Sequence, residues 1–349
     1  MSKKMFTAAA LAACGMSLAA YADTAVTENT TVGGRAFIDL TSLDQQTATG
    51  AKTAASGFGL DVKRFYLIAN HTFDDIWSAN LTTDFNYTSG QTQSPTETQL
   101  FIKKAYLQAK ISDAFWVRAG SADLAWVPFT EEVYGYRYVE QVLVDRLKFG
   151  TSADWGVHIG GKFVDGKVAY ALSAVEGNGY RNPTRSKSLD VEGRLSFKPV
   201  DGLTAAVGFY SGKLGKDVEG TTTPPLHTAT RYDALLAYGN EHFKIGGEYF
   251  KADNWNTVTA TTTDSSDGFA ITASVPVSSK ASVFARYDND KPSKDLAPNK
   301  KEDYYNAGVS CKPRKGVDLA VVWKHDEVKN NGATTSKSDE FGVWTQVSF

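Results

Sequence analysis

The chain has 349 residues, with 37 Lys and Arg against 39 Asp and Glu, and a formal net charge of -2. This mildly acidic balance argues against nucleic acid as a partner, because nucleic acid binding relies on basic surfaces. The mean hydropathy is -0.30, and beyond the N-terminal region no stretch approaches 18 consecutive apolar residues, which excludes a helical membrane span there.

The N-terminus predicts export. Lys3 and Lys4 precede an Ala-rich apolar run over residues 6–20, which is short for a membrane span. The run ends in Ala20-Tyr21-Ala22, an A-x-A cleavage pattern. We therefore expect residues 1–22 to be a cleaved signal peptide.

Cleavage after Ala22 would start the mature chain at Asp23, and the loss of Lys3 and Lys4 would change its net charge from -2 to -4. The alternative is a lipoprotein cleavage box at residues 11–14, in which Cys14 would become the lipidated first residue. Removal of the leader after Ala22 leaves Cys311 as the single cysteine, so we expect no internal disulfide.

Short and long connections alternate along the rest of the chain. Seven short ones contain turn-forming residues and lie at 71–76, 112–114, 164–167, 199–202, 239–242, 276–280 and 312–316. Eight longer polar segments lie around residues 43–56, 90–96, 122–154, 177–188, 213–229, 253–265, 290–302 and 328–338. Fifteen connections join sixteen strands, with both chain ends on the short-turn side. This asymmetry is characteristic of bacterial outer-membrane barrels, whose short turns are periplasmic.

Apolar and polar residues alternate between these connections, as expected for strands between lipid and a polar lumen. A Lys or Arg on the lipid face costs about 2–4 kcal/mol at mid-membrane, so charged strand residues should face inward. The predicted lumen-lining residues are Arg35, Arg118, Lys162, Lys244, Glu248, Arg286 and Lys324. In segments 62–68 and 101–107 adjacent charges do not show which face of the strand points inward. A subunit interface or a contact with another loop would explain charges on both faces.

Residues 339–349 alternate strictly and finish on Phe349, a pattern typical of the last strand of such a barrel and of its recognition by the barrel-assembly machinery. An open sheet edge in hydrocarbon would leave backbone groups unpaired, so the first strand, around 32–42, must pair with the last. The predicted fold is an all-β, transmembrane antiparallel β-barrel of about sixteen strands, which is wide enough for an aqueous channel.

The longest connection, residues 122–154, is unusually apolar and aromatic for a solvated loop. We expect it to fold inward, pack against the barrel wall and form the constriction of the channel. The candidate constriction residues are Glu131, Glu132, Arg137, Asp145, Arg146 and Lys148. The alternatives are a surface cap or trimer latch for the loop, and plain pairing of Arg137 and Arg146 with loop carboxylates.

Four segments in and around this loop carry a family resemblance. They are Val117-Arg-Ala-Gly-Ser, Val127-Pro-Phe-Thr-Glu-Glu, Tyr136-Arg-Tyr-Val-Glu and Asp154-Trp-Gly-Val-His-Ile-Gly-Gly. They resemble the phosphate-selective porin O/P family, which implies a sixteen-stranded trimeric outer-membrane channel whose anion selectivity comes from basic lumen side chains. The basic residues that this sequence offers for that role are Arg137, Arg146 and Lys148 in the loop and Arg35, Arg118 and Lys162 on candidate lumen faces.

We expect a passive channel for small hydrophilic solutes and ions in the outer membrane of a Gram-negative bacterium, because loop charges of both signs suit general diffusion. The alternatives are an anion- or phosphate-selective channel and a structural or adhesive barrel with a closed lumen. The expected partners are two further copies in a homotrimer, outer-membrane lipid and lipopolysaccharide. The five histidines show no triad pattern with Ser or Asp, so we expect no enzyme, no cofactor and no metal.

Overall fold

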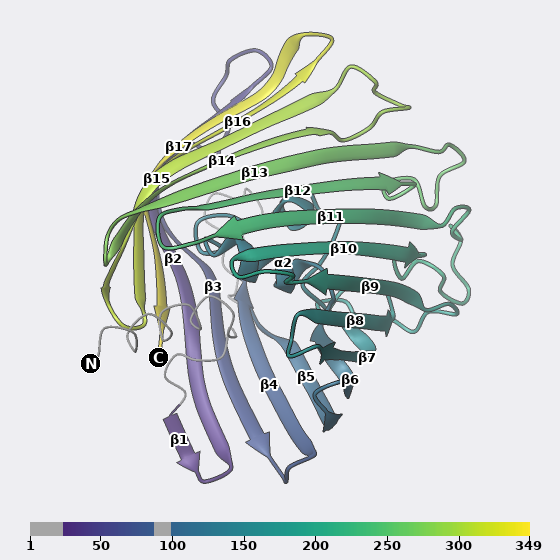
Figure 1. The fold of residues 1–349 in the computed structure, drawn as a ribbon. Coiled ribbons are helices and arrows are strands. Elements are labelled where there is room, and N and C mark those ends of the chain that lie inside the picture. Colours follow the sequence, from purple (N-terminus) through teal and green to yellow (C-terminus); the bar gives the residue numbers. More distant parts are fainter. Residues whose placement is uncertain (1–23, 87–98) are drawn as a thin grey trace.

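The computed structural model describes residues 24–86 and 99–349, which form one antiparallel sheet of seventeen strands that closes into a barrel (Figure 1). The predicted leader (1–22) and the predicted loop around 90–96 lie outside the described residues. No helix in the described ranges is long and apolar enough to cross a membrane.

Two short helices, α2 (Val127–Tyr134) and α3 (Leu143–Arg146), lie between the sixth and seventh strands. The strands are β1 (Thr24–Thr27), β2 (Thr30–Thr47), β3 (Gly57–Thr72), β4 (Trp77–Asn86), β5 (Gln99–Ser112), β6 (Phe115–Asp123), β7 (Ala153–Phe163), β8 (Val168–Val175), β9 (Asp190–Phe197), β10 (Leu203–Gly212), β11 (Ala229–Gly239), β12 (Lys244–Asp253), β13 (Ser265–Ser278), β14 (Ala281–Lys291), β15 (Lys301–Arg314), β16 (Val317–Asn330) and β17 (Ala333–Ser348).

The last strand closes the barrel on the first long one, as predicted. β17 pairs with β2 from Ser336↔Thr47 to Ser348↔Arg35. Beyond this ladder, the backbones of Gly34 and Phe349 exchange two hydrogen bonds of 2.7 and 3.1 Å. β1 was not predicted; it pairs with the first residues of β2, Thr30 to Val32. The barrel itself therefore has the sixteen predicted strands β2–β17.

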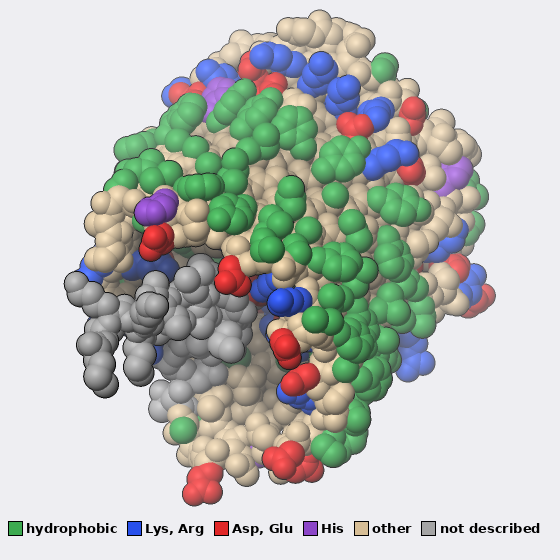
Figure 2. Space-filling view, in the orientation of Figure 1, with side chains coloured by type: hydrophobic (Ala, Val, Ile, Leu, Met, Phe, Trp, Pro, Cys, Tyr) green, Lys and Arg blue, Asp and Glu red, His purple; other side chains and the backbone are tan. Residues whose placement is uncertain are grey.

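The alternation predicted for the strands is confirmed by side-chain exposure. On β16, Val321 and Trp323 are 49% and 44% exposed, whereas Val322 and Lys324 between and beside them are 1% and 8% exposed. Figure 2 shows hydrophobic side chains covering the outer face of the strands, with many charged side chains near its upper and right-hand margins, where the long loops lie. The outer face is thus suited to lipid and the inner face to polar groups.

All seven short turns connect strands where they were predicted. The prediction of a long loop at 328–338 is wrong, because β16 and β17 continue to a two-residue turn at Asn331 and Gly332. Both residues have positive φ (52° and 80°), as this type of hairpin turn requires. The polar sequence gave no indication of a strand because this part of the hairpin extends beyond the apolar band, where no alternation is required.

Two β-bulges explain the adjacent charges at 62–68 and 101–107. Val62 lies opposite Ile38 and Arg64 opposite Phe37, so Lys63 is an extra residue in β3. Ile102 and Lys104 lie opposite Thr83 and Thr82, so Lys103 is an extra residue in β5. A bulge lets two neighbouring side chains point to the same side of a sheet, and no subunit interface is needed to account for the adjacent charges.

The loop between β6 and β7 forms α2 for local reasons. Pro128 stands in its first turn, where the missing N–H costs nothing, and Gly135 ends it with a φ of 81°. In Figure 1, α2 lies within the curve of the strands rather than above their ends.

Candidate functional site: the barrel interior

The 122–154 segment is attached to the inner faces of the strands. Trp126 is fully buried; its backbone N–H donates to Glu192 (2.9 Å) and its indole N–H to Glu248 (3.0 Å). Glu248 also accepts a hydrogen bond from the backbone N–H of Leu143 (3.3 Å), so one wall carboxylate holds both helices of the loop. Burial of a side chain such as Leu143 adds roughly 1.5–3 kcal/mol to this attachment.

The tip of the loop is held by a second group of wall residues. Lys324 on β16 donates to the carbonyl of Val139 (2.8 Å) and lies 3.1 Å from the Glu140 carboxylate. Burial alone would raise the pKa of Glu140, but Lys324 and Arg286 more than offset this effect and lower the pKa to about 2. The Tyr304 hydroxyl also donates to Glu140 (3.1 Å). Glu140 is therefore a charged anchor at neutral pH.

Arg146 at the end of α3 is surrounded by acidic wall residues. Its guanidinium contacts Asp288 on β14 at 3.0 Å and Glu302 on β15 at 2.5 Å. Asp290 and Asp326 lie at 3.8 and 3.9 Å, beyond direct hydrogen bonding. One loop cation thus faces four carboxylates, which we call the acidic wall: Asp288, Asp290, Glu302 and Asp326.

The return of the loop to β7 is fixed by a buried arginine. Arg231 on β11 contacts the carbonyl of Phe149 and pairs with Asp233 (2.9 Å) and Glu192 (3.0 Å). Gly150 allows this approach, because a Cβ there would lie 2.8 Å from the guanidinium of Arg231. This anchor could not be predicted from the sequence, since the partners are far apart along the chain.

Arg137 is paired within the loop itself. Its guanidinium contacts Glu131 and lies 3.6 Å from Asp145. Burial alone would lower its pKa, but these two carboxylates raise the pKa above its usual range. Glu132 is exposed in the cavity below α2, and Lys148 is exposed and makes no ion pair with another described residue. The six predicted constriction residues therefore lie in one loop but differ in environment: Glu131, Arg137, Asp145 and Arg146 are in ion pairs, whereas Glu132 and Lys148 are exposed.

The strands across the barrel carry cations of a different kind. Each of four cations lies over an aromatic ring. Lys103 is 4.7 Å from the centre of the Tyr66 ring and Arg118 is 4.4 Å from that of Trp116. Arg181 is 4.6 Å from that of Phe101 and Arg194 is 3.9 Å from that of Phe129. Within residues 24–86 and 99–349, none of these four cations makes a salt bridge with a carboxylate. We call them the basic wall; they come from β5, β6, β9 and the loop before β9.

The structure places the predicted lumen residues as follows. Three of them, Glu248, Arg286 and Lys324, contact the loop. Arg35 and Arg118 line a cavity of about 430 Å³ below α2, and Lys244 approaches Gly135. Lys162 lies on the same face of β7 as His158, at the exposed end of the strand. Lys103, Arg181 and Arg194 were not identified as lumen residues. The bulge that turns Lys103 inward is not visible in the sequence, and Arg181 lies in the loop between β8 and β9, where no alternation applies. Arg194 lies on β9 on the same face as Glu192 and Ser196, so alternation could have identified it.

The arrangement defines a class of protein, an outer-membrane barrel with a polar interior into which one loop folds. More particularly, the sequence matches the Gram-negative porin family over residues 7–331, and the chain belongs to that family. It is an outer-membrane channel for passive diffusion. No curated protein matches the sequence.

Solved structures of outer-membrane proteins share the fold. An anion-selective porin from Comamonas acidovorans has 13% identity and a TM-score of 0.64, over 92% of this chain and 99% of that one. The outer membrane channel DcaP of Acinetobacter baumannii has 13% identity and a TM-score of 0.63, over 94% and 100%. OmpT of Vibrio cholerae, described in a trimer form, has 13% identity and a TM-score of 0.58, over 92% and 99%. At this identity the likeness concerns the fold.

Proposed function

We propose that this porin filters small hydrophilic solutes and ions between two charged walls, with the 122–154 loop as its constriction. The supporting observation is the separation of charge: the basic wall on β5–β9 holds four cations that make no salt bridge with a described carboxylate, and the acidic wall on β14–β16 holds four carboxylates around Arg146. Strands eight apart in a sixteen-stranded barrel lie across from one another, as β6 and β14 do. Opposed charges of this kind act on dipolar and charged solutes as they pass.

Reversal potentials in a potassium chloride gradient test the two walls separately. Replacement of Arg118 and Arg194 by Gln should shift the permeability ratio several-fold toward cations, and replacement of Asp290 and Asp326 by Asn should shift it toward anions. The matched control is Lys198→Gln, which removes an exposed cation from a short turn. Unchanged reversal potentials in both double variants would contradict the two-wall filter.

Anion or phosphate selectivity is a second candidate, favoured by Arg118 and Arg194, which share the cavity of about 430 Å³ below α2. The finer assignment to the phosphate-selective O/P family rests on the four sequence motifs, while the family match is to Gram-negative porins as a whole. Block of the potassium chloride current by low concentrations of phosphate would support the selective channel. Current that phosphate does not change would leave general diffusion.

The remaining features of the proposal concern export and assembly. Residues 1–22 would act as the signal peptide, Phe349 as the signal for barrel assembly, and lipid, lipopolysaccharide and two further copies would surround each barrel. Catalysis is not part of the proposal: His158 bonds Ser173 on β7 and β8, while His325 bonds Asp339 on β16 and β17, so these polar pairs lie on separate parts of the barrel.

A further inference from the structure

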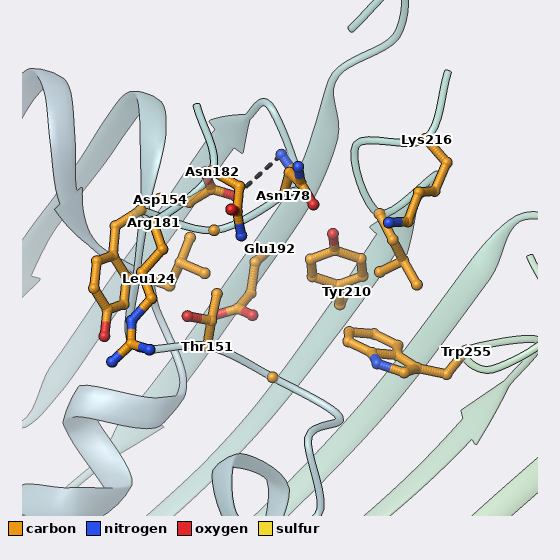
Figure 3. Close-up of a pocket in the computed structure, with 15 residues that line it drawn as sticks. Leu124, Thr151, Asp154, Asn178, Arg181, Asn182, Glu192, Tyr210, Lys216 and Trp255 are labelled. Atoms are coloured by element: carbon orange, nitrogen blue, oxygen red, sulfur yellow. Dashed lines mark hydrogen bonds between the residues drawn. The ribbon is translucent and has the colours of Figure 1, made fainter. Parts of the chain in front are cut away.

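A cavity of about 310 Å³ lies at the mouth of the barrel where the long loops gather, and it shares only Arg181 with the two walls described above. It is lined by the loop residues 177–182, by Leu214 and Lys216 of the next long loop, by Trp255 and by the end of the 122–154 segment. Figure 3 shows Tyr210 and Trp255 on one side of this cavity, Asn178 and Asn182 above it, and Glu192 and Thr151 near its centre.

Buried carboxylates fix the loops that form this cavity. Asp190 accepts hydrogen bonds from the Tyr210 hydroxyl (2.5 Å) and from the backbone N–H groups of Lys213 and Leu214, both at 2.7 Å. Asp154 accepts one from the backbone N–H of Gly177 (3.0 Å). The cavity is therefore formed before any solute arrives, which lowers the entropic cost of binding.

The two loops also touch each other closely. A Cβ at Gly215 would lie 2.5 Å from Asn178, and Gly215 has a φ of 63°. Trp255 is fixed as well, because its indole N–H donates to the carbonyl of Lys148 (3.0 Å). Its ring lies 4.9 Å from that of Tyr210, and together they give the cavity an aromatic side.

The charges around the cavity disfavour a charged ligand. An anion would lie near the buried carboxylates of Asp154 and Glu192, the second of which is paired with Arg231, and a cation would meet the exposed side chains of Arg181 and Lys216. The neutral groups are an aromatic side, the two amides and the Thr151 hydroxyl. The side chain of Asn182 is exposed and makes no hydrogen bond to another described residue, so both its donor and its acceptor are available.

We propose that this cavity binds a neutral, polyhydroxylated ring of the size of one hexose. Such a solute presents an apolar ring face to Tyr210 and Trp255 and hydroxyl groups, which both donate and accept, to the amides and the Thr151 hydroxyl. A volume of about 310 Å³ lies at the lower end of the range for small-molecule sites, about 300–1,000 Å³, and suits one ring rather than an oligosaccharide.

Isothermal titration of the refolded protein with glucose, gluconate and glucosamine tests the proposal, because these three solutes share a size and differ in charge. We expect saturable binding of glucose at one site per chain and at least tenfold weaker binding of the other two. Absence of saturable glucose binding, or equal or tighter binding of gluconate or glucosamine, would overturn the proposal.

Asn182→Ala locates the site. It should weaken glucose binding about two- to tenfold, the range expected for one neutral hydrogen bond, while the matched variant Asn299→Ala, in a loop away from the cavity, binds as the parent does. Heat-induced unfolding of both variants shows that each is folded. A folded Asn182→Ala protein with unchanged glucose affinity would place the sugar elsewhere and overturn the assignment.

This inference is separable from the proposed filter. Reversal potentials recorded without sugar report on the two charged walls, whereas the titration reports on the cavity at the mouth. A channel with the expected ion selectivity and no glucose binding overturns the sugar site alone, and a protein that binds glucose but shows no wall-dependent selectivity overturns the filter alone.

Discussion

Glu140 is a residue whose charge state can be followed through pH. Its carboxylate lies 3.1 Å from Lys324, its side chain is 18% exposed, and its pKa is lowered from 4.5 to about 2. A carboxyl group with a lowered pKa stabilises the folded state above its unfolded pKa, and this stabilisation is lost as the pH falls toward the folded pKa. The loop anchor should therefore be complete at pH 6 and be lost between about pH 4.5 and 2.

Glu140→Gln isolates this contribution from that of other groups. The free energy of unfolding of the parent minus that of the variant, measured by denaturant unfolding in detergent, should be constant from pH 7 to 5. It should fall by about 3 kcal/mol as the pH approaches and passes 2, because each pKa unit corresponds to about 1.4 kcal/mol. A difference that does not change with pH would contradict a charged Glu140 anchor.

Gly208 on β10 lies directly under Trp126. A Cβ at this position would lie 2.5 Å from the indole ring, too close for any atom to remain in place. Gly208→Ala should therefore displace Trp126 and destabilise the protein by about 1–3 kcal/mol, as overpacking does.

The control for Gly208→Ala is Gly247→Ala on β12, where the nearest atom to a new Cβ is 3.9 Å away. Heat-induced unfolding in detergent compares the two variants. Equal stability of both would mean that Trp126 does not pack on Gly208 in the folded barrel.

At the scale of elements, α3 depends on one arginine for its contact with the acidic wall. Without Arg146, the carboxylates of Asp288, Asp290, Glu302 and Asp326 would face one another with no loop cation between them. We expect Arg146→Ala to release this part of the loop, so that single-channel conductance increases and selectivity shifts toward cations.

Lys148→Ala is the matched control for this prediction, since it removes a cation from the same loop that makes no ion pair with another described residue. It should change selectivity slightly and leave conductance close to that of the parent. If Arg146→Ala conducts as Lys148→Ala does, Arg146 contributes charge alone and does not hold the loop.

The β-bulges in β3 and β5 determine which cations reach the interior. Lys63 would follow the alternation outward in a regular strand, but as the extra residue of a bulge it lies 2.9 Å from Asp61 and 3.5 Å from Asp39. Its neighbour Arg64 reaches Asp84 at 3.3 Å. Adjacent charges in a barrel strand are therefore an indication of a bulge.

For the whole molecule, the proposed trimer predicts a specific electrical signature. Insertion of one assembly of three channels should produce current steps of one size, each of which can close in three equal parts. Mass measurement in mild detergent before and after heating should give a species three times the mass of the chain that dissociates to one. A particle of one chain under all mild conditions would contradict the trimer.

Strand number and turn positions could be predicted because lipid on one side and water on the other force period-two alternation, which seven turns interrupt with Gly, Pro, Asp or Asn. Alternation does not extend to the outer part of β16 and β17, and it does not report a bulge, which is defined by the partner strand. Arg137 and Arg146 could be placed in the loop, but the contact of Arg146 with Asp288 joins residues 142 positions apart and depends on barrel closure.

The anchors of the 122–154 loop have an implication for the order of folding. The wall partners of the loop all follow it in the chain, by 66 to 185 positions from the residues that they contact; they are Glu192, Arg231, Glu248, Arg286 and Lys324. These hydrogen bonds and ion pairs to the wall therefore cannot form until β9–β16 are in place, and contacts over such separations are slow to form. The barrel wall would therefore form first, with an open interior, and the 122–154 loop would take up its position inside the barrel afterwards.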